Sequence, residues 1–154
     1  MIVGKKKLFA IEYEIKNKVD DWILGQFRLW VSSKIIGDWD DDSVDLKGCF
    51  KWLPTLMEEK VNRSEPALEN LNGEQVIFKT FDAFYSEDNQ NCIVDSFSRF
   101  HISHIGMSSF DGFDIVLLEE AESFRFVWRD KKKRIFDEKV SKKEVHRVLK
   151  SAQL

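Results

Sequence analysis

Hydrophobic and polar residues alternate along two stretches near the start of the chain, Leu8–Ile15 and Trp22–Ser32. Successive side chains of a strand point to opposite faces, so this period of two buries one face and leaves the other polar. The mostly polar connection Lys16–Asp21 predicts that the two strands pair antiparallel. The apolar positions are Phe9, Ile11, Tyr13 and Ile15 in the first strand and Phe27, Leu29 and Val31 in the second.

A tight turn and an acidic segment follow the second strand. Ser32–Lys34 is predicted to form the turn, after which Ile35–Ile36 resumes a β-branched run that Gly37 and Asp38 end. Trp39 and the consecutive aspartates Asp40–Asp42 come next. The simpler interpretation of this segment is a solvated acidic corner, and the alternative is an exposed acidic, aromatic rim that a protein partner recognises.

The first helical pattern lies directly after these aspartates. Asp42 or Ser43 is expected to cap the helix, and Pro54 is expected to kink it because proline lacks the backbone donor that a continuing helix needs. The apolar residues at helical spacing are Leu46, Cys49, Phe50 and Leu53.

Two further helices are predicted from spacing and capping. Glu74–Tyr85 carries apolar residues at intervals of three and four, which is the pattern of an amphipathic helix. Ser141 and Glu144 form an S-x-x-E capping box for a final helix. The residues that would dock this last helix are Val145, Val148, Leu149 and Ala152.

The second half of the chain has mainly strand patterns. Phe97–Ser103 alternates and is predicted to be a strand, Phe113–Glu119 and Phe124–Arg129 form a hairpin, and Arg134–Glu138 is an edge strand whose charges discourage further pairing. The expected fold is therefore α+β. We expect a single domain over residues 1–154, with a mainly antiparallel sheet flanked by about three helices.

Charge is distributed unevenly along a chain whose net charge is −3. Residues 129–154 hold 10 Lys or Arg against 4 Asp or Glu, a balance of +6, whereas residues 1–128 hold 14 against 23, a balance of −9. An acidic body disfavours nucleic acid as a ligand because phosphates require facing positive charge, and it favours a basic protein partner.

Cysteine content and hydropathy indicate the compartment. Cys49 and Cys92 are too few for a disulfide framework, and they are not spaced as a C-x-x-C pair. No apolar run has membrane-spanning length. The stretch after Lys5–Lys7 is interrupted by Glu12 and Glu14, as expected for a strand and not for a signal peptide. We expect a cytoplasmic protein with reduced thiols.

Catalytic and metal-binding motifs are scarce. His101 and His104 suggest a small metal-dependent enzyme, but on a strand this spacing sends the two rings to opposite faces. The acidic segment lacks the alternating order of a calcium loop, and there is no phosphate-binding glycine loop or nucleophile elbow. A nucleic-acid-binding regulatory module that uses the basic C-terminal segment is a second alternative. This inventory favours a binding protein over an enzyme.

Three segments together resemble immunity proteins of bacterial polymorphic and contact-dependent toxin systems, specifically the immunity protein 42 family. The first is FAIEYEI at Phe9–Ile15, and the second is ILGQFRLWVSSKIIGDWD at Ile23–Asp40. The third is FDGFDIVLLEEAESFRFVWRD at Phe110–Asp130. The block Ile36–Gly37–Asp38 is the most specific part of the resemblance.

The resemblance implies a cytoplasmic antitoxin that is not an enzyme. It would bind the C-terminal toxin domain of a cognate effector, often a nuclease, as a one-to-one heterodimer. No catalytic residue, cofactor, metal, nucleic acid, membrane or small-molecule substrate is expected. We place the toxin-binding surface on the acidic segment and on two glutamates after the first helix. Its predicted residues are Asp38, Trp39, Asp40, Asp41, Asp42, Glu58 and Glu59.

Overall fold

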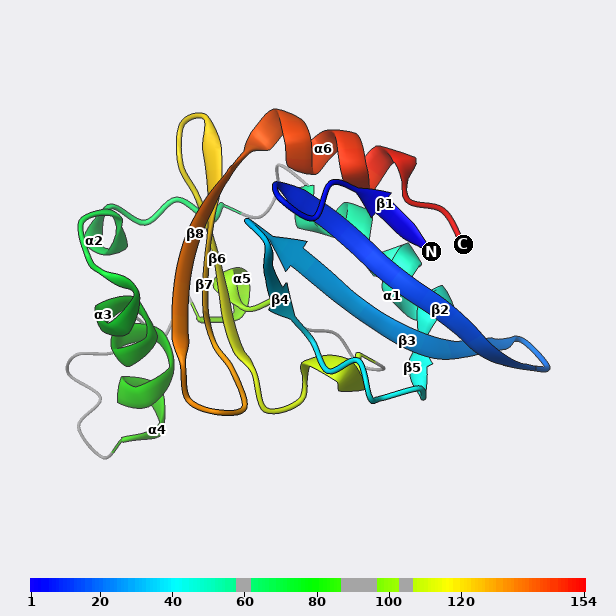
Figure 1. Cartoon of the computed structure of the whole chain (residues 1–154). Coiled ribbons are helices and arrows are strands. Elements are labelled where there is room, and N and C mark those ends of the chain that lie inside the picture. Colours follow the sequence, from blue (N-terminus) through cyan, green and yellow to red (C-terminus); the bar gives the residue numbers. More distant parts are fainter. Residues whose placement is uncertain (58–61, 87–96, 103–106) are drawn as a thin grey trace.

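The computed structural model describes residues 1–57, 62–86, 97–102 and 107–154, and it has the predicted α+β class (Figure 1). Its strands are β1 (Ile2–Gly4), β2 (Phe9–Val19), β3 (Trp22–Val31), β4 (Lys34–Ile36), β5 (Val44–Asp45), β6 (Asp114–Glu119), β7 (Ser123–Arg129) and β8 (Ile135–Ser141). Its α-helices are α1 (Leu46–Trp52), α2 (Pro66–Glu69), α3 (Gly73–Ile77), α4 (Ala83–Tyr85), α5 (Phe97–Phe100) and α6 (Lys142–Ser151). Two 3₁₀ turns, Leu53–Met57 and Ser108–Phe110, and a π-helical turn, Phe78–Asp82, complete the described elements. None of the described helices has the length and apolar character needed to cross a membrane.

The first sheet is antiparallel, in the order β1-β2-β3-β4, and β5 pairs with the opposite end of β3 from β4. The predicted pairing of β2 with β3 is confirmed, from Phe9 opposite Val31 to Val19 opposite Trp22. Ser32 and Ser33 form the turn into β4 with φ angles of 49° and 69°. Positive φ at both central residues matches the twist of a two-residue hairpin and holds the two strands in register.

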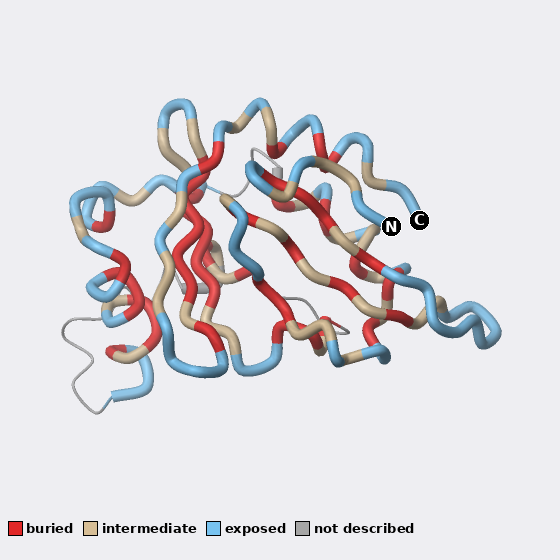
Figure 2. Tube along the Cα trace, in the orientation of Figure 1, coloured by how far each residue is buried: buried red, intermediate tan, exposed pale blue. Residues whose placement is uncertain are grey.

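The alternation of β3 separates a buried face from a partly exposed one. Phe27, Leu29 and Val31 are fully buried, whereas Arg28 and Trp30 on the other face are not. Towards the hairpin tip both strands leave the body, and residues 14–22 are all exposed (Figure 2). The core therefore covers only the base of this hairpin.

The second sheet has the order β6-β7-β8 and is covered on both faces. One face packs on the first sheet, where the rings of Phe9 and Phe126 stack with centroids 5.7 Å apart. The other face contributes Val116 and Val127 to a second buried cluster with residues of α2 and α3. The predicted hairpin Phe113–Glu119/Phe124–Arg129 is confirmed, but the antiparallel strands are divided between two sheets.

The predicted helices at Glu74–Tyr85 and after Ser141 are confirmed. The first is the continuous helical segment α3, π turn and α4, which starts with an Asn72–Gln75 capping box. In α6 the Ser141 hydroxyl accepts the backbone N–H of Glu144 at 3.3 Å. This helix packs against strands of both sheets, so the C-terminal segment joins the two halves of the fold (Figure 1).

Two local predictions are wrong. Phe97–Ser103 was expected to be a strand, but Phe97–Phe100 is helical and only His101 forms a bridge, to Val116. The prediction depended on two apolar residues two positions apart, Phe100 and Ile102, which are both buried. The same spacing occurs where a short helix ends and an extended segment follows, so it does not identify a strand. Ser103 lies outside the described residues.

The N-cap of α1 is Asp45, and not Asp42 or Ser43. Val44 and Asp45 pair with Gly25 and Leu24 as strand β5, so the helix begins two or three residues later than predicted. Helical spacing of Leu46, Cys49 and Leu53 is confirmed, and all three side chains are buried.

Arg125 connects the second sheet to the helices on its outer face. The side chain is only 4% exposed. Its guanidinium donates two hydrogen bonds to Asp137, at 2.8 and 2.6 Å, and further bonds to the carbonyl groups of Leu68, Glu69 and Leu71. These carbonyl groups lie in the last turn of α2 and just after it, where helix geometry leaves acceptors without partners inside the helix. One side chain thus pairs with a neighbouring strand and terminates a helix.

Replacing Arg125 tests this connection. Arg125→Met keeps an apolar stem but removes the donor that Asp137 and the carbonyl groups of Glu69 and Leu71 share, so we expect the free energy of unfolding to fall by about 2–4 kcal/mol. Urea denaturation followed by tryptophan fluorescence measures the change. Lys16→Met is the matched control, because its ion pair with Glu14 is exposed and contributes roughly 0.5 kcal/mol or less. Equal losses in the two variants would contradict the proposed connection.

Candidate functional site

The loop between β4 and β5 contains the five consecutive predicted residues Asp38–Asp42, which we call the acidic corner. Gly37 turns the chain out of β4 with a φ of +113°, a conformation that side chains other than glycine rarely adopt. A Cβ at this position would lie 3.1 Å from the ring of Phe110 and 3.2 Å from the carbonyl oxygen of Phe27. Glycine therefore lets the corner start directly against the core.

Asp38 is fixed at the start of the corner. Its carboxylate forms an ion pair with the Lys131 ammonium at 2.6 Å and accepts the backbone N–H of Asp40 at 3.0 Å. Its own N–H donates to the carbonyl of Ser109 at 2.7 Å. The hydrogen bond from Lys131 is the main reason that the pKa of Asp38 lies below its ordinary value. Asp38 is consequently a charged residue anchored to the second half of the chain.

Asp41 is fixed in a similar way. It accepts hydrogen bonds from the backbone N–H of Ser43 at 3.0 Å and from the Ser43 hydroxyl at 2.6 Å. Burial raises the pKa of Asp41, but hydrogen bonds from Ser108 and Ser43 outweigh this effect and lower it. Asp40 and Asp42, by contrast, are exposed, and neither carboxylate has a partner among the described residues. The corner thus contains two anchored carboxylates and two exposed ones.

Trp39 packs against the polar face of β3. The guanidinium carbon of Arg28 lies 4.3 Å from the centre of the Trp39 ring and 5.0 Å from that of Trp30. The amide of Gln26, two residues before Arg28, donates to the carbonyl of Trp39. The cation–π contact with Arg28 holds the Trp39 ring, and the hydrogen bond from Gln26 holds its backbone. Strand β3 therefore determines where the Trp39 indole lies.

Glu12 on β2 holds Arg28 in place. One carboxylate oxygen accepts from Arg28 at 2.7 Å and from the Trp30 indole at 2.6 Å, and the other accepts from Lys6 at 3.0 Å. Burial raises the pKa of Glu12, but these hydrogen bonds outweigh it and lower the pKa to about 2. The corner and its aromatic neighbours therefore form one preorganised surface of carboxylates, indoles and a guanidinium. Such a surface suits recognition of a basic protein.

One comparison shows the family of this chain, and another shows a similar fold. A family model described as immunity protein 42 matches residues 1–153. The chain belongs to the immunity protein 42 family. Its fold is similar to the crystal structure of CdiI from Burkholderia dolosa AUO158, with a TM-score of 0.65 and 14% sequence identity, covering 98% of this chain and 97% of that one. No curated protein matches it in sequence.

The structure describes five of the seven residues that were predicted to form the interface of this immunity protein 42 family member. Asp38, Trp39, Asp40, Asp41 and Asp42 lie together in one loop. Glu58 and Glu59 lie outside the described residues, so their part in the surface stays a prediction.

The metal hypothesis rested on His101 and His104. His104 lies outside the described residues. Burial lowers the pKa of His101, and its ring stands edge-on to Phe81 with centroids 5.6 Å apart. Within the described ranges, no three His, Cys, Asp or Glu side chains are grouped so that they could hold a metal ion. These contacts are those of a packed histidine.

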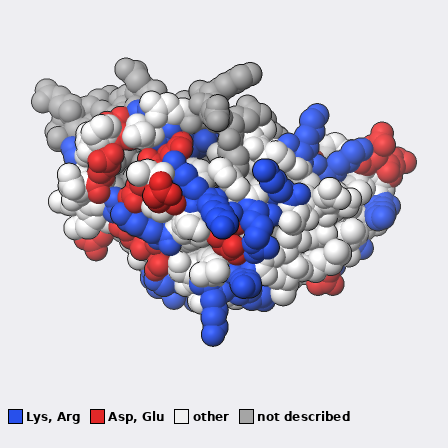
Figure 3. Space-filling model, turned by 90° about the horizontal axis from the view of Figure 1, so that it is seen from above, with Lys and Arg blue, Asp and Glu red and all other residues white. Residues whose placement is uncertain are grey.

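The basic C-terminal segment was the basis of the nucleic-acid alternative. Lys and Arg side chains gather over the centre of the face that α6 covers, with acidic side chains among them (Figure 3). Several cations of the C-terminal segment are paired within the chain: Lys131 with Asp38, Lys142 with Glu119 at 2.7 Å, and Arg147 with Glu144 at 2.7 Å. Much of this positive charge is therefore compensated inside the protein.

The sequence predicted the five adjacent residues of the corner but not most of the residues that hold them in place. The alternation of β3 places Gln26, Arg28 and Trp30 on one face, and this pattern could have indicated the stack under Trp39. Lys131 and Ser108 gave no such signal, because they approach the corner from elements that lie far away along the chain.

The Glu12 cluster should make stability depend on pH in the acidic range. The pKa of Glu12 in the folded protein, about 2, lies below its ordinary value of 4.5, so its stabilising effect is complete above pH ~4.5 and is lost as the pH falls towards 2. Glu12→Gln should lower the free energy of unfolding at neutral pH, and its difference from wild type should shrink over that range. Urea denaturation at several pH values measures this, with the exposed Glu14→Gln as control. Parallel curves for wild type and Glu12→Gln would contradict the assignment.

Proposed function

We propose that this chain is an immunity protein that binds the C-terminal toxin domain of a contact-dependent or polymorphic toxin effector and neutralises it without catalysing a reaction. Membership of the immunity protein 42 family supports the role, and so does a fold shared with a protein named CdiI. The complex is a one-to-one heterodimer in the cytoplasm, where the delivered toxin would act.

The acidic corner is the proposed contact surface. The observation that carries this proposal is that the corner combines fixed and exposed carboxylates. Asp38 and Asp41 are anchored by hydrogen bonds. Asp40 and Asp42 are exposed, and Trp39 next to them is partly exposed. A preorganised loop loses little conformational freedom on binding, so more of its interaction energy appears as affinity. Trp and Arg are also the residues most enriched among those that dominate binding energy at interfaces.

A nuclease is the proposed toxin class. Enzymes that bind nucleic acid present positive charge to the phosphate backbone. Carboxylates on the corner would occupy that surface in place of phosphates and would steer the encounter over long range. Inhibition then follows from occlusion of the substrate path.

Co-expression with the toxin domain encoded immediately upstream tests the function. Growth should be rescued when both proteins are made, and a pulldown followed by light scattering should give a stable complex of one copy each. A well-folded protein that neither protects cells nor binds this domain would contradict the proposal.

Charge reversal tests the surface. Asp40→Lys/Asp42→Lys changes two exposed carboxylates and leaves the anchored ones intact, so toxin binding should weaken by a factor on the order of 10² or more without loss of stability. Glu74→Lys/Glu122→Lys is the matched control, because it makes the same change in net charge at exposed positions on α3 and in the β6–β7 turn. Isothermal titration calorimetry measures both. Unchanged affinity of the corner variant would show that another face binds the toxin.

A further inference from the structure

The turn between β7 and β8 carries four consecutive cations, Lys131–Arg134, which we call the basic turn. Its first and last members are paired within the chain, with Asp38 and Asp130 respectively. The two middle members, Lys132 and Lys133, are exposed, and neither ammonium group has a partner among the residues that the structure describes. The basic turn thus combines paired and free charges, as the acidic corner does with the opposite sign.

Asp130 holds the backbone of the basic turn. Its carboxylate accepts the N–H groups of Lys132 and Arg134, each at 2.9 Å, and its carbonyl accepts the N–H of Lys133 at 2.9 Å. A turn fixed in this way loses little conformational freedom when it meets a partner. Both charged loops are therefore prepared for binding before a partner arrives.

The basic turn and the acidic corner lie side by side at one end of the molecule (Figure 1). The Lys131 side chain that joins them passes over Gly112, where a Cβ would lie 3.3 Å from the Cγ atom of Lys131. Phe113, next to this glycine, is partly exposed. One surface therefore presents two free carboxylates, Asp40 and Asp42, next to two free ammonium groups, with the Lys131 crossing between them.

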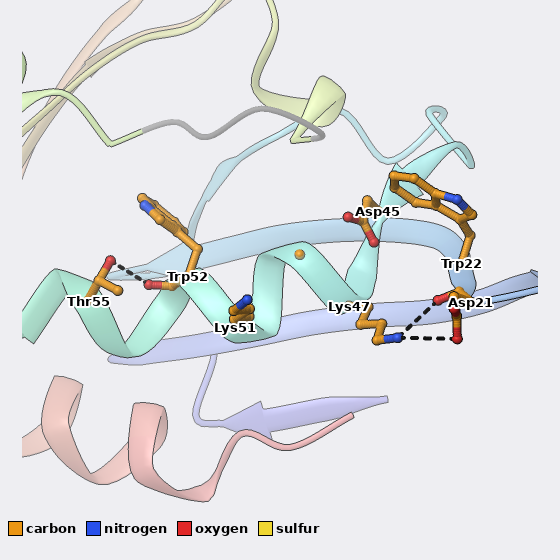
Figure 4. Close-up of a pocket in the computed structure, with 8 residues that line it drawn as sticks. Asp21, Trp22, Asp45, Lys47, Lys51, Trp52 and Thr55 are labelled. Carbon is orange, nitrogen blue, oxygen red and sulfur yellow. Dashed lines mark hydrogen bonds and ion pairs between the residues drawn. The ribbon is translucent and has the colours of Figure 1, made fainter.

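The groove of about 580 Å³ beside α1 does not separate its charges in this way (Figure 4). Its charged lining residues are two aspartates and two lysines, Asp21, Asp45, Lys47 and Lys51. The Lys47 ammonium already lies 3.8 Å from the Asp21 carboxylate. Charges mixed within one groove select neither an acidic nor a basic partner. Charges separated into two neighbouring loops select a partner that carries the reverse order.

We propose that this surface binds a second copy of the chain, with the acidic corner of each copy facing the basic turn of the other. A two-fold symmetric interface needs a patch that is complementary to itself. Rotation about an axis near Gly112 brings the free carboxylates of each copy to the free ammonium groups of its partner, and Phe113 of both copies lies near the axis. The contact consists mainly of solvated charges, so the dimer is weak, reversible and sensitive to salt.

The dimer covers the acidic corner. A toxin domain bound at the corner and a second copy of the chain therefore exclude one another, and this consequence rests on the proposed function. The dimer itself does not rest on it, because its test requires no toxin.

Sedimentation equilibrium of the wild-type protein tests the dimer directly. At about 50 mM NaCl the average mass should rise with protein concentration from 18.1 kDa towards twice that value, and at about 500 mM NaCl it should stay at 18.1 kDa. Protein concentrations up to about 1 mM cover the range of a weak dimer. A wild-type protein that stays monomeric throughout this range at low salt would overturn the proposal.

Exchanging the charges tests which surfaces meet. Asp40→Lys/Asp42→Lys makes both contacts of a dimer repulsive, and so does Lys132→Glu/Lys133→Asp, in which aspartate suits the φ of 63° at position 133. Self-association of either variant should weaken at least about tenfold. An equimolar mixture of the two restores both contacts, so it should form a heterodimer with about the affinity of the wild-type dimer.

A matched mixture controls for net charge. Glu74→Lys/Glu122→Lys changes the net charge as the corner variant does, but it keeps the wild-type corner and turn. Mixed with the variant of the basic turn, it leaves one of the two contacts repulsive, so this mixture should associate at least about tenfold more weakly than the complementary one. Thermal melts should show that every variant remains folded.

Cross-linking is a second measurement, and it needs no variant. A carbodiimide joins a carboxylate directly to an amine, and mass spectrometry of a mixture of unlabelled and isotope-labelled wild-type protein shows which links join two copies. Links from Asp40 or Asp42 to Lys132 or Lys133 should carry one label from each copy.

The outcomes separate this proposal from the proposed function. A complementary mixture that associates no better than the control mixture, or cross-links confined to single copies, would overturn the dimer. If the dimer forms but the toxin does not bind, only the proposed function fails. If the toxin binds and no dimer forms, the proposed function stands and the self-complementary surface is wrong.

Discussion

The register of strand β3 is the constraint on which the core and the candidate site both depend. This strand pairs with β2 along its length, with β4 at one end and with β5 at the other. Its odd-numbered positions fill the core, whereas Arg28 and Trp30 support the corner. A slip of one residue would exchange the two faces, burying charge and exposing the core. The Ser32–Ser33 turn opposes that slip, so the core and the acidic corner depend on the same strand alignment.

The acidic corner is built by both halves of the chain. Lys131 and the carbonyl of Ser109 reach Asp38 from the segments flanking β6 and β7, and Gln26 reaches Trp39 from β3. A loop held from two sheets has one conformation to offer, which lowers the entropy lost on binding. The same arrangement explains why the second sheet must be fixed firmly. Arg125 joins β7 to β8, and α6 packs on strands of both sheets, so both help to fix the hairpin from which Lys131 reaches Asp38.

Local pattern was sufficient to predict the elements that carry most of the fold. The period of two in β2, β3 and β7 and the helical spacing in Glu74–Tyr85 each recur over several residues, so tertiary context did not override them. Phe97–Phe100 was misjudged because a short apolar pattern has no clear period. The five residues of the corner were predicted to lie together because they are adjacent in sequence. Their supports were not predicted, since the pairing of Lys131 with Asp38 and the stacking of Arg28 under Trp39 are products of tertiary structure.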